Sequence, residues 1–252
     1  MVSPLDFQLV NAARQGDCPT LETLLAQGAH VNGTDLQNTS ALMYAAQRGH
    51  REVVHCLLLA GANVNQQRAF SGLTALMFAV AANRVEIVQD LILAKAQVNQ
   101  TNDDGNTPLM IAAYKGHTEI VTHLMSAGAD IYHQNKQGNT ALKLAIKGDY
   151  PEIIHLLPNF QDELTPEKAL VFAIRCGSLK VFQSLLTPET DIDSPDAEGE
   201  TLLFLAAAEG QTAIIQALIA SGAKVNQQDQ EAETPLHLSL IHISEPTRPI
   251  AI

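Results

Sequence analysis

The 252-residue sequence predicts an all-α repeat solenoid. Three observations lead to this fold class: a fixed internal period, a second landmark with the same spacing, and two short helical patterns within each period. An alanine followed by alanine or an aliphatic residue recurs at steps of 33, 34, 33, 33, 28 and 33 residues. An aliphatic residue followed by asparagine, as in Val31-Asn32 and Val64-Asn65, keeps the same spacing. Such a period is typical of a stacked array in which each copy buries its apolar face against its neighbours.

Residues 105–132 contain the signals for two helices within one copy. Thr107 can cap the first helix through its hydroxyl, and Pro108 fits the first helical position. Gly116 suits the left-handed residue that ends this helix, and Gly128 ends the second. The apolar residues of each helix fall on one face. They are Leu109, Ala112 and Ala113 in the first helix, and Ile120, Val121, Leu124 and Met125 in the second.

Some copies depart from this pattern. The third copy has one extra residue between Asn65 and Thr74. It also has Asn83 and Lys95 where the other copies end their helices with glycine. Asparagine tolerates the left-handed region, whereas lysine does so poorly. We therefore expect the second helix of the third copy to end irregularly.

The two best-preserved copies read TPLMIAAYKGHTEIVTHLMSAGADI (107–131) and SALMYAAQRGHREVVHCLLLAGANVN (40–65). Both resemble the ankyrin repeat, whose pattern is roughly G-x-T-P-L-H-x-A-A-x-x-G-H-x-E-I-V-x-x-L-L-x-x-G-A-D-V-N. The resemblance covers about residues 7–238, as seven copies and the start of an eighth. It implies an ankyrin-repeat stack of helix–loop–helix units with β-hairpin fingers, which binds other proteins through its finger tips and inner helices.

In this register, residues 1–157 form copies one to five, with an N-terminal cap in 1–35. Residues 158–166 form a shortened, hairpin-less junction that is either a hinge or an ordinary short loop. Residues 167–238 form copies six and seven and the start of the eighth. Residues 239–252 depart from the pattern, and residues 238–248, LSLIHISEPTR, resemble one reading frame of a sequencing adapter. We expect a non-native tail after a truncated eighth copy, with a divergent natural tail as the alternative.

Composition narrows the class of partner. The net charge is −12 and the pI is near 5.1, without a basic run, so a nucleic-acid partner is not expected. No apolar stretch is long enough to span a bilayer. The scattered cysteines Cys18, Cys56 and Cys176 point to a reducing compartment. We expect a cytoplasmic monomer without membrane contact, although secretion as an effector is left open.

No catalytic motif is present. The glycines lie at repeat turns rather than in a phosphate loop, and there is no nucleophile elbow. His50, His55 and Cys56 are candidate metal ligands by residue type. However, His50 occupies a repeat position, and adjacent His55 and Cys56 point in different directions from a helix. We expect no enzyme activity, no cofactor and no metal, and we expect Asn32, Asn65, Asn99 and Asn226 to make structural hydrogen bonds.

Transferring the family's contact positions residue by residue gives candidates for partner binding. These are Arg48, Phe70, Leu73, Asp103, Asp104, Asn106, Tyr114, Lys115, Lys136, Lys147, Glu198, Glu200 and Glu209. Phe70 and Leu73 are apolar where the repeat normally has polar residues, and Phe70 either binds a partner or folds back over its own finger. Tyr114 and Arg48 are residue types enriched at binding hot spots. The acidic run 187–201 either attracts a basic partner or is a solvated loop.

The sequence thus predicts a non-enzymatic protein-binding scaffold. The alternative is that the array is the recognition arm of a larger enzyme or translocated effector whose catalytic domain lies outside this sequence.

Overall fold

The computed structural model describes residues 3–157, 164–196 and 199–235. The adapter-like tail, Glu198 and most of the expected junction at 158–166 lie outside these residues. Contacts divide the chain into two compact units, Met1–Leu144 and Ala145–Ile252. This boundary falls inside one helix, α9 (Ala141–Lys147).

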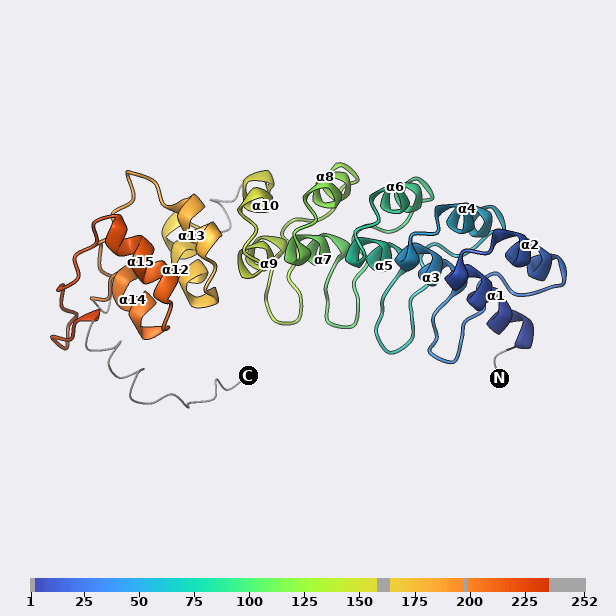
Figure 1. Cartoon of the computed structure of the whole chain (residues 1–252), viewed down its shortest axis with the longest axis horizontal. Helices are drawn as coiled ribbons and strands as arrows, with labels where there is room; N and C mark the ends of the chain where they lie inside the picture. The colour runs from blue at the N-terminus through green and yellow to red at the C-terminus, as the bar shows by residue number, and fades with distance from the viewer. Residues whose placement is uncertain (1–2, 158–163, 197–198, 236–252) are drawn as a thin grey trace. The chain divides into compact units, whose positions relative to one another are not determined.

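The first unit is a double row of short helices that pack in chain order (Figure 1). One row contains α1 (Pro4–Gln15), α3 (Ala41–Arg48), α5 (Ala75–Ala81) and α7 (Pro108–Lys115). These are the inner helices. The other row contains α2 (Cys18–Ala26), α4 (Arg51–Leu59), α6 (Val85–Leu93) and α8 (Thr118–Ser126). These are the outer helices.

The second unit repeats the helix pairing. It contains the end of α9, then α10 (Pro151–Leu156), α12 (Pro166–Cys176), α13 (Leu179–Leu185), α14 (Leu202–Ala208) and α15 (Thr212–Ala220). Helices α12 and α14 pack together, as do α13 and α15. Among the described residues of both units there is no sheet, so the all-α repeat solenoid is confirmed. The expected hairpin fingers are tight turns, with one isolated antiparallel bridge between Thr34 and Ser40.

The helices begin and end where the sequence signals them. Thr107 Oγ1 accepts a hydrogen bond from the Met110 amide at 3.3 Å, and Pro108 is the first helical residue. This cap satisfies an amide that has no partner within the helix. Gly116 ends the helix with a left-handed φ of 77°. Equivalent caps come from Ser40, Thr74, Thr165 and Thr201.

Small residues line the contacts between the inner helices. Ala45, Ala46, Ala112 and Ala113 are fully buried, which lets neighbouring backbones approach closely. On the outer helix α8, Ile120, Val121 and Leu124 are also fully buried, and Met125 is half-buried. The two apolar faces expected for this copy are therefore the ones that bury.

A series of side-chain hydrogen bonds joins each copy to the next. The side-chain oxygen of one copy's asparagine, or of Asp193 in the second unit, accepts from a backbone N–H in the turn after the following outer helix. The pairs are Asn32 with Asn63 (2.7 Å), Asn65 with Gln97 (2.8 Å), Asn99 with Asp130 (2.8 Å) and, in the second unit, Asp193 with Lys224 (2.9 Å). We call these bonds the asparagine ladder. The structural role expected for Asn32, Asn65 and Asn99 is present, and the copy after Asn226 lies outside the described residues.

At the N-terminal end, Asp6 takes the place of the ladder asparagine. Its Oδ1 accepts from the His30 amide at 2.8 Å, the same position in the repeat as Asn63. Asp6 is buried against Gly33, where an added Cβ would lie 2.6 Å from the Asp6 Cγ. The first copy thus closes its turn with a side chain of its own.

The irregular end expected for α6 is wrong. Lys95 adopts a left-handed φ of 68°, close to the 86° of Gly128 in the next copy. The C-cap of α6 is Ala94, one residue before Lys95. In the same way, the C-cap of α8 is Ala127, one residue before Gly128, so the two helices end alike. The preceding copy holds this turn in place, because Asn65 Nδ2 donates to the Lys95 carbonyl and Asn65 Oδ1 accepts from the Gln97 amide. Lys95 therefore adopts the strained left-handed conformation, and the end of the helix is unchanged.

Leu124→Ala is expected to lower the free energy of unfolding by about 2–5 kcal/mol, because it removes fully buried methyl groups. Urea titration followed by circular dichroism measures this loss. Leu93→Ala, at a site 78 % exposed on α6, should change stability by less than about 0.5 kcal/mol. Equal losses in the two variants would contradict the assigned outer-helix faces.

Lys95→Gly is expected to raise the free energy of unfolding by about 0.5–1 kcal/mol, because glycine adopts the left-handed region without a Cβ penalty but loses more chain entropy. Lys95→Ala is the control, since it removes the charge and keeps the strain. An alanine variant as stable as the glycine variant would show that the backbone conformation is not the cause.

Candidate functional site

Four of the finger tips share one type of turn. Asp35 Oδ1 accepts from the amides of Gln37 at 2.8 Å and Thr39 at 3.0 Å. Its backbone N–H also donates to the Thr39 carbonyl. A short carboxylate or amide side chain thereby satisfies the turn locally. Asn102, Asn135 and Asp229 make the same pair of bonds in their own copies.

Neighbouring tips in the first unit are joined by hydrogen bonds, which makes them a continuous row. The contacts are Arg68 Nε to the Gln37 carbonyl, the Asp103 amide to the Ser71 carbonyl, and the Lys136 amide to the Asp104 carbonyl, each at 3.1 Å. The side chains of Asp103, Asp104 and Lys136 are exposed along this row. We call it the tip row.

The third tip is one residue longer than the others. Arg68 N–H pairs with the Leu73 carbonyl, five residues on, whereas Asp35 pairs with Thr39, four residues on. Phe70 lies in this longer turn with a left-handed φ of 61° and is 94 % exposed. It therefore does not fold back over its own finger. Leu73 is half-buried, and Leu36 in the preceding tip is 81 % exposed.

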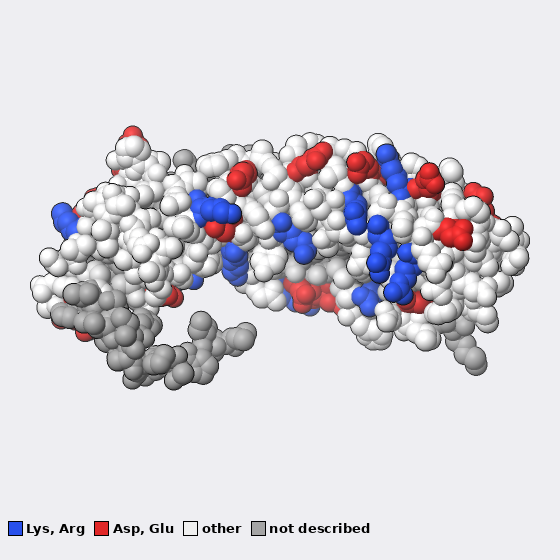
Figure 2. Space-filling view, viewed as in Figure 1, with Lys and Arg blue, Asp and Glu red and all other residues white. Residues whose placement is uncertain are grey.

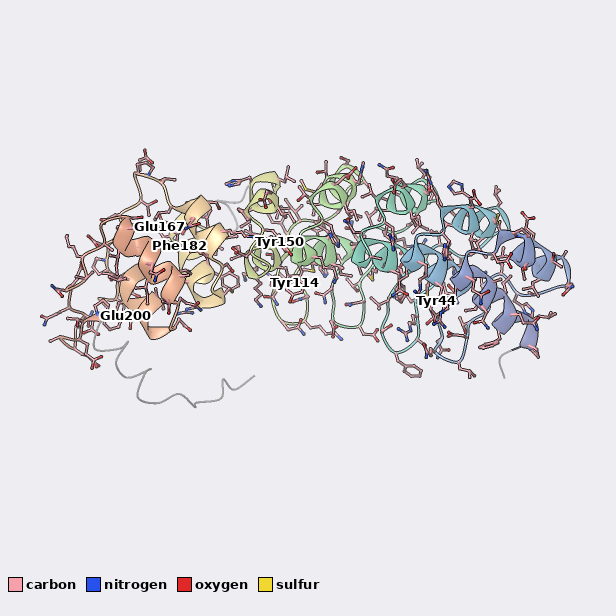
Figure 3. All side chains as sticks on the ribbon, viewed as in Figure 1. Tyr44, Tyr114, Tyr150, Glu167, Phe182 and Glu200 are labelled. Carbon is pink, nitrogen blue, oxygen red and sulfur yellow. The ribbon has the colours of Figure 1, made fainter. Side chains whose placement is uncertain are left out.

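The inner helices carry further exposed candidate residues near their C-terminal ends. Arg48 ends α3 and Lys115 ends α7, and both are exposed. Tyr114, labelled in Figure 3, is 55 % exposed. By contrast, Tyr44 is held: its hydroxyl donates to Asp35 Oδ2 at 2.9 Å, and the Arg14 guanidinium lies 5.6 Å from its ring centre.

Other predicted positions are not free surface of this row. The Asn106 side-chain oxygen accepts from Asn135 Nδ2 at 2.7 Å, so its role includes joining two copies. Lys147, Glu200 and Glu209 belong to the second unit, where Lys147 and Glu209 are exposed and Glu200 is half-buried (Figure 3 labels Glu200). Glu198 lies outside the described residues.

Basic residues that sequence reasoning missed gather near the end of α3. Arg84 Nε donates to the Gln47 carbonyl at 3.4 Å and packs over Gly49, next to Arg48. Figure 2 shows Lys and Arg side chains gathered over the α3 and α5 part of the first unit. The protein is acidic as a whole, so this face is locally basic. The sequence signal was weak because these arginines occupy different positions of their copies.

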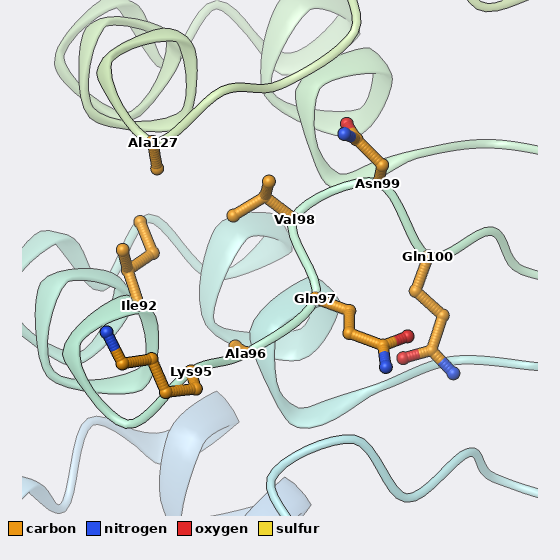
Figure 4. A pocket seen from close by; sticks show the side chains of 8 residues that line it. All are labelled: Ile92, Lys95, Ala96, Gln97, Val98, Asn99, Gln100 and Ala127. Carbon is orange, nitrogen blue, oxygen red and sulfur yellow. The ribbon is translucent and has the colours of Figure 1, made fainter.

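No described cavity carries a catalytic constellation. An open pocket of about 660 Å³ lies beside the turn after α6 (Figure 4). Its lining is Ile92, Lys95, Ala96, Gln97, Val98, Asn99, Gln100 and Ala127. Asn99 is committed to the asparagine ladder, and no carboxylate, histidine or cysteine lines this pocket. The pocket therefore lacks a nucleophile with a base beside it.

The histidines considered as ligands are each engaged elsewhere. His50 Nε2 lies 3.2 Å from the Arg14 carbonyl of the preceding copy. His55 Nε2 lies 2.8 Å from Asp90 Oδ2, where Arg51 forms a two-pronged ion pair at 2.6 and 2.9 Å. The hydrogen bond from Arg51 lowers the pKa of Asp90, which keeps this link between α4 and α6 charged. His55 thus contacts α6 through Asp90, whereas Cys56 contacts Glu22 on α2.

Comparison with known proteins identifies this architecture. A family model for ankyrin repeats, made of three copies, matches residues 9–102, 76–168 and 170–245. This chain belongs to the ankyrin-repeat family. The ankyrin repeat is a non-catalytic interaction fold. In the described part of the chain, no helix combines the length and apolar character needed to cross a membrane.

Individual relatives match only part of this ankyrin-repeat chain. A probable E3 ubiquitin-protein ligase, XBOS33, from Oryza sativa subsp. japonica is 42 % identical over 72 residues, 29 % of this chain and 13 % of the relative. The inactive serine/threonine-protein kinase TEX14 of Mus musculus is 39 % identical over 28 % of this chain and 5 % of its own length. Ankyrin repeat domain-containing protein 29 of Danio rerio is 40 % identical over 26 % of this chain and 22 % of its own length. The matches therefore cover far less than two thirds of each relative.

His117, which follows the glycine that ends α7, yields a pH prediction. Burial lowers the pKa of His117 below its usual 6.5, the charge of Lys115 acts in the same direction, and the Ala81 backbone opposes it. The folded state thus binds this proton less readily than the unfolded state, so stability falls as pH drops below about 6.5. Denaturant titrations between about pH 7 and 5 should show a shallower loss in His117→Gln than in wild type. His155→Gln, at an exposed site, should leave the slope unchanged.

Proposed function

We propose that this chain is a non-enzymatic module that binds a partner protein through the tip row and the exposed ends of the inner helices. The surface runs from Leu36 and Phe70 along the tips and includes Arg48, Tyr114 and Lys115. It is carried by a rigid stack, so the partner meets side chains whose backbone is already ordered. Such pre-organisation reduces the entropy lost on binding.

One observation carries this proposal: Phe70 is 94 % exposed while its backbone has a φ of 61°. An aromatic residue in the left-handed region costs folding free energy, and exposure returns no burial. A residue that weakens the free protein in both ways is best explained by a contact made in a complex. Tyr114, 55 % exposed on the same unit, adds a second aromatic anchor of the type found at hot spots.

The charge of the partner follows from which unit binds it. The acidic run of residues 187–201 in the second unit favours a partner with a basic patch. The arginines around α3 in the first unit favour instead a partner that brings acidic side chains to this face. A partner that contacts both units would carry both kinds of charge.

The alternative is that these repeats are the recognition arm of a larger enzyme or effector. Its support is that similar repeats occupy small parts of long relatives, 13 % of a probable E3 ubiquitin-protein ligase and 5 % of an inactive kinase. In that case the same surface would bind the substrate of the larger protein. Sequencing the complete transcript distinguishes the two, because a catalytic motif in the same reading frame favours the recognition arm.

Phe70→Ala with Tyr114→Ala is expected to weaken partner binding by at least about 30-fold, the factor that corresponds to 2 kcal/mol at a hot spot. Affinity capture with the wild-type chain, followed by mass spectrometry, identifies the partner. Calorimetric titration of that partner then compares the variants. Circular dichroism should show unchanged helical content, because neither side chain is buried.

Leu59→Ala is the matched control. Leu59 is 90 % exposed, but it lies at the end of outer helix α4. It should leave affinity unchanged. Unchanged affinity in the double variant, or an equal loss in Leu59→Ala, would place the interface elsewhere.

A further inference from the structure

Two outer helices bring three potential metal ligands together outside the proposed protein-binding surface. Cys18 and Glu22 lie one turn apart on α2, and Cys56 lies on the neighbouring α4. Their ligand atoms all lie within 4.8 Å of one another. Cys56 Sγ is 3.7 Å from Glu22 Oε1. We call this group the Cys18–Glu22–Cys56 cluster.

We propose that the Cys18–Glu22–Cys56 cluster binds a zinc ion, with water as the fourth ligand. This differs from the expectation of no metal. That expectation considered His50, His55 and Cys56, which the fold separates, and did not group the two cysteines that the fold brings together.

The donor set points to zinc among the common divalent ions. Calcium and magnesium take oxygen ligands, whereas thiolate sulfur binds zinc well and tolerates a carboxylate beside it. Protein zinc sites with three side-chain ligands keep an open position that water occupies.

The distances suit one tetrahedral ion. With metal–ligand bonds of about 2.0–2.3 Å, tetrahedral ligand atoms lie roughly 3.3–3.8 Å apart. The separation of Cys56 Sγ from Glu22 Oε1 already falls in this range. The remaining separations, at most 4.8 Å, close by side-chain rotation. Both cysteines are half-buried and Glu22 is exposed, so an ion can enter from solvent and the carboxylate is free to turn.

The charge of the cluster also fits a cation. None of the ion pairs among the described residues includes Glu22, so a divalent ion would be the positive charge that the cluster lacks. Binding requires both thiols to lose their protons, so affinity should rise with pH.

A bound ion would join the first copy to the second. Among the described residues, α1 of the first copy packs on α3, and α2 packs on α4. Ligands from both α2 and α4 would reinforce this contact, because metal binding to the folded state alone adds to its stability.

Titration of the reduced full chain with Co²⁺, as a spectroscopic substitute for zinc, tests the site. We expect a thiolate-to-cobalt charge-transfer band and the visible bands of tetrahedral cobalt, both saturating at one equivalent. Zinc should then displace cobalt and bleach the spectrum. Absence of the charge-transfer band, with the thiols shown to be reduced, overturns the proposal.

Variants assign the ligands. Cys18→Ser and Cys56→Ser should each abolish the charge-transfer band or weaken binding by more than about 100-fold, and Glu22→Gln should weaken binding by about tenfold or more. Cys176→Ser is the matched control, since Cys176 is the third half-buried cysteine and lies on α12 in the other unit. Zinc should raise the thermal unfolding midpoint of wild type and Cys176→Ser but not of Cys56→Ser. Full binding by Cys18→Ser and Cys56→Ser, or loss of binding in Cys176→Ser, refutes the assigned site.

Discussion

The stack depends on one recurring hydrogen bond, from a backbone amide of each copy to the side-chain oxygen of an asparagine in the copy before it. Asn32, Asn65 and Asn99 make this bond at 2.7–2.8 Å. Each one satisfies an amide that the turn after an outer helix would otherwise leave without a protein partner. The bond recurs at the same position of these copies, and Asp6 supplies it for the first copy. The buried alanines and aliphatic residues pack in the interior of the same copies.

The ladder and the helix caps supply hydrogen-bond partners for the backbone amides of the turns and helix ends. Most side chains at the tips are therefore not needed for folding. Asp35 and Asn102 close their turns through local hydrogen bonds. Most of the side chains between each of them and the next helix are therefore not required to form the turn. This division explains how a strained, exposed Phe70 persists in an otherwise regular array. The stability comes mainly from contacts between copies, and the proposed recognition surface adds only the hydrogen bonds that join neighbouring tips.

Most of the fold was readable from the sequence, because its signals are local and repeat in register. Thr107, Gly116 and the buried face of α8 are such cases. The end of α6 was not, since neighbouring copies force Lys95 into a conformation that its own preference opposes. The sequence indicates which positions are candidates for the surface, but not how their side chains are oriented. Whether Phe70 points outward, and whether Cys18 meets Cys56, depend on how each turn and helix is rotated against the next copy.

The longer third tip shows that length and register are independent in this architecture. The turn from Arg68 to Leu73 holds one more residue than the turn from Asp35 to Thr39, yet Thr74 caps α5 as Ser40 caps α3. Insertions at a tip therefore stay local, and the cost of a longer loop grows only slowly with its length. Recognition in such a chain can diversify one loop at a time, without any compensating change in the helices.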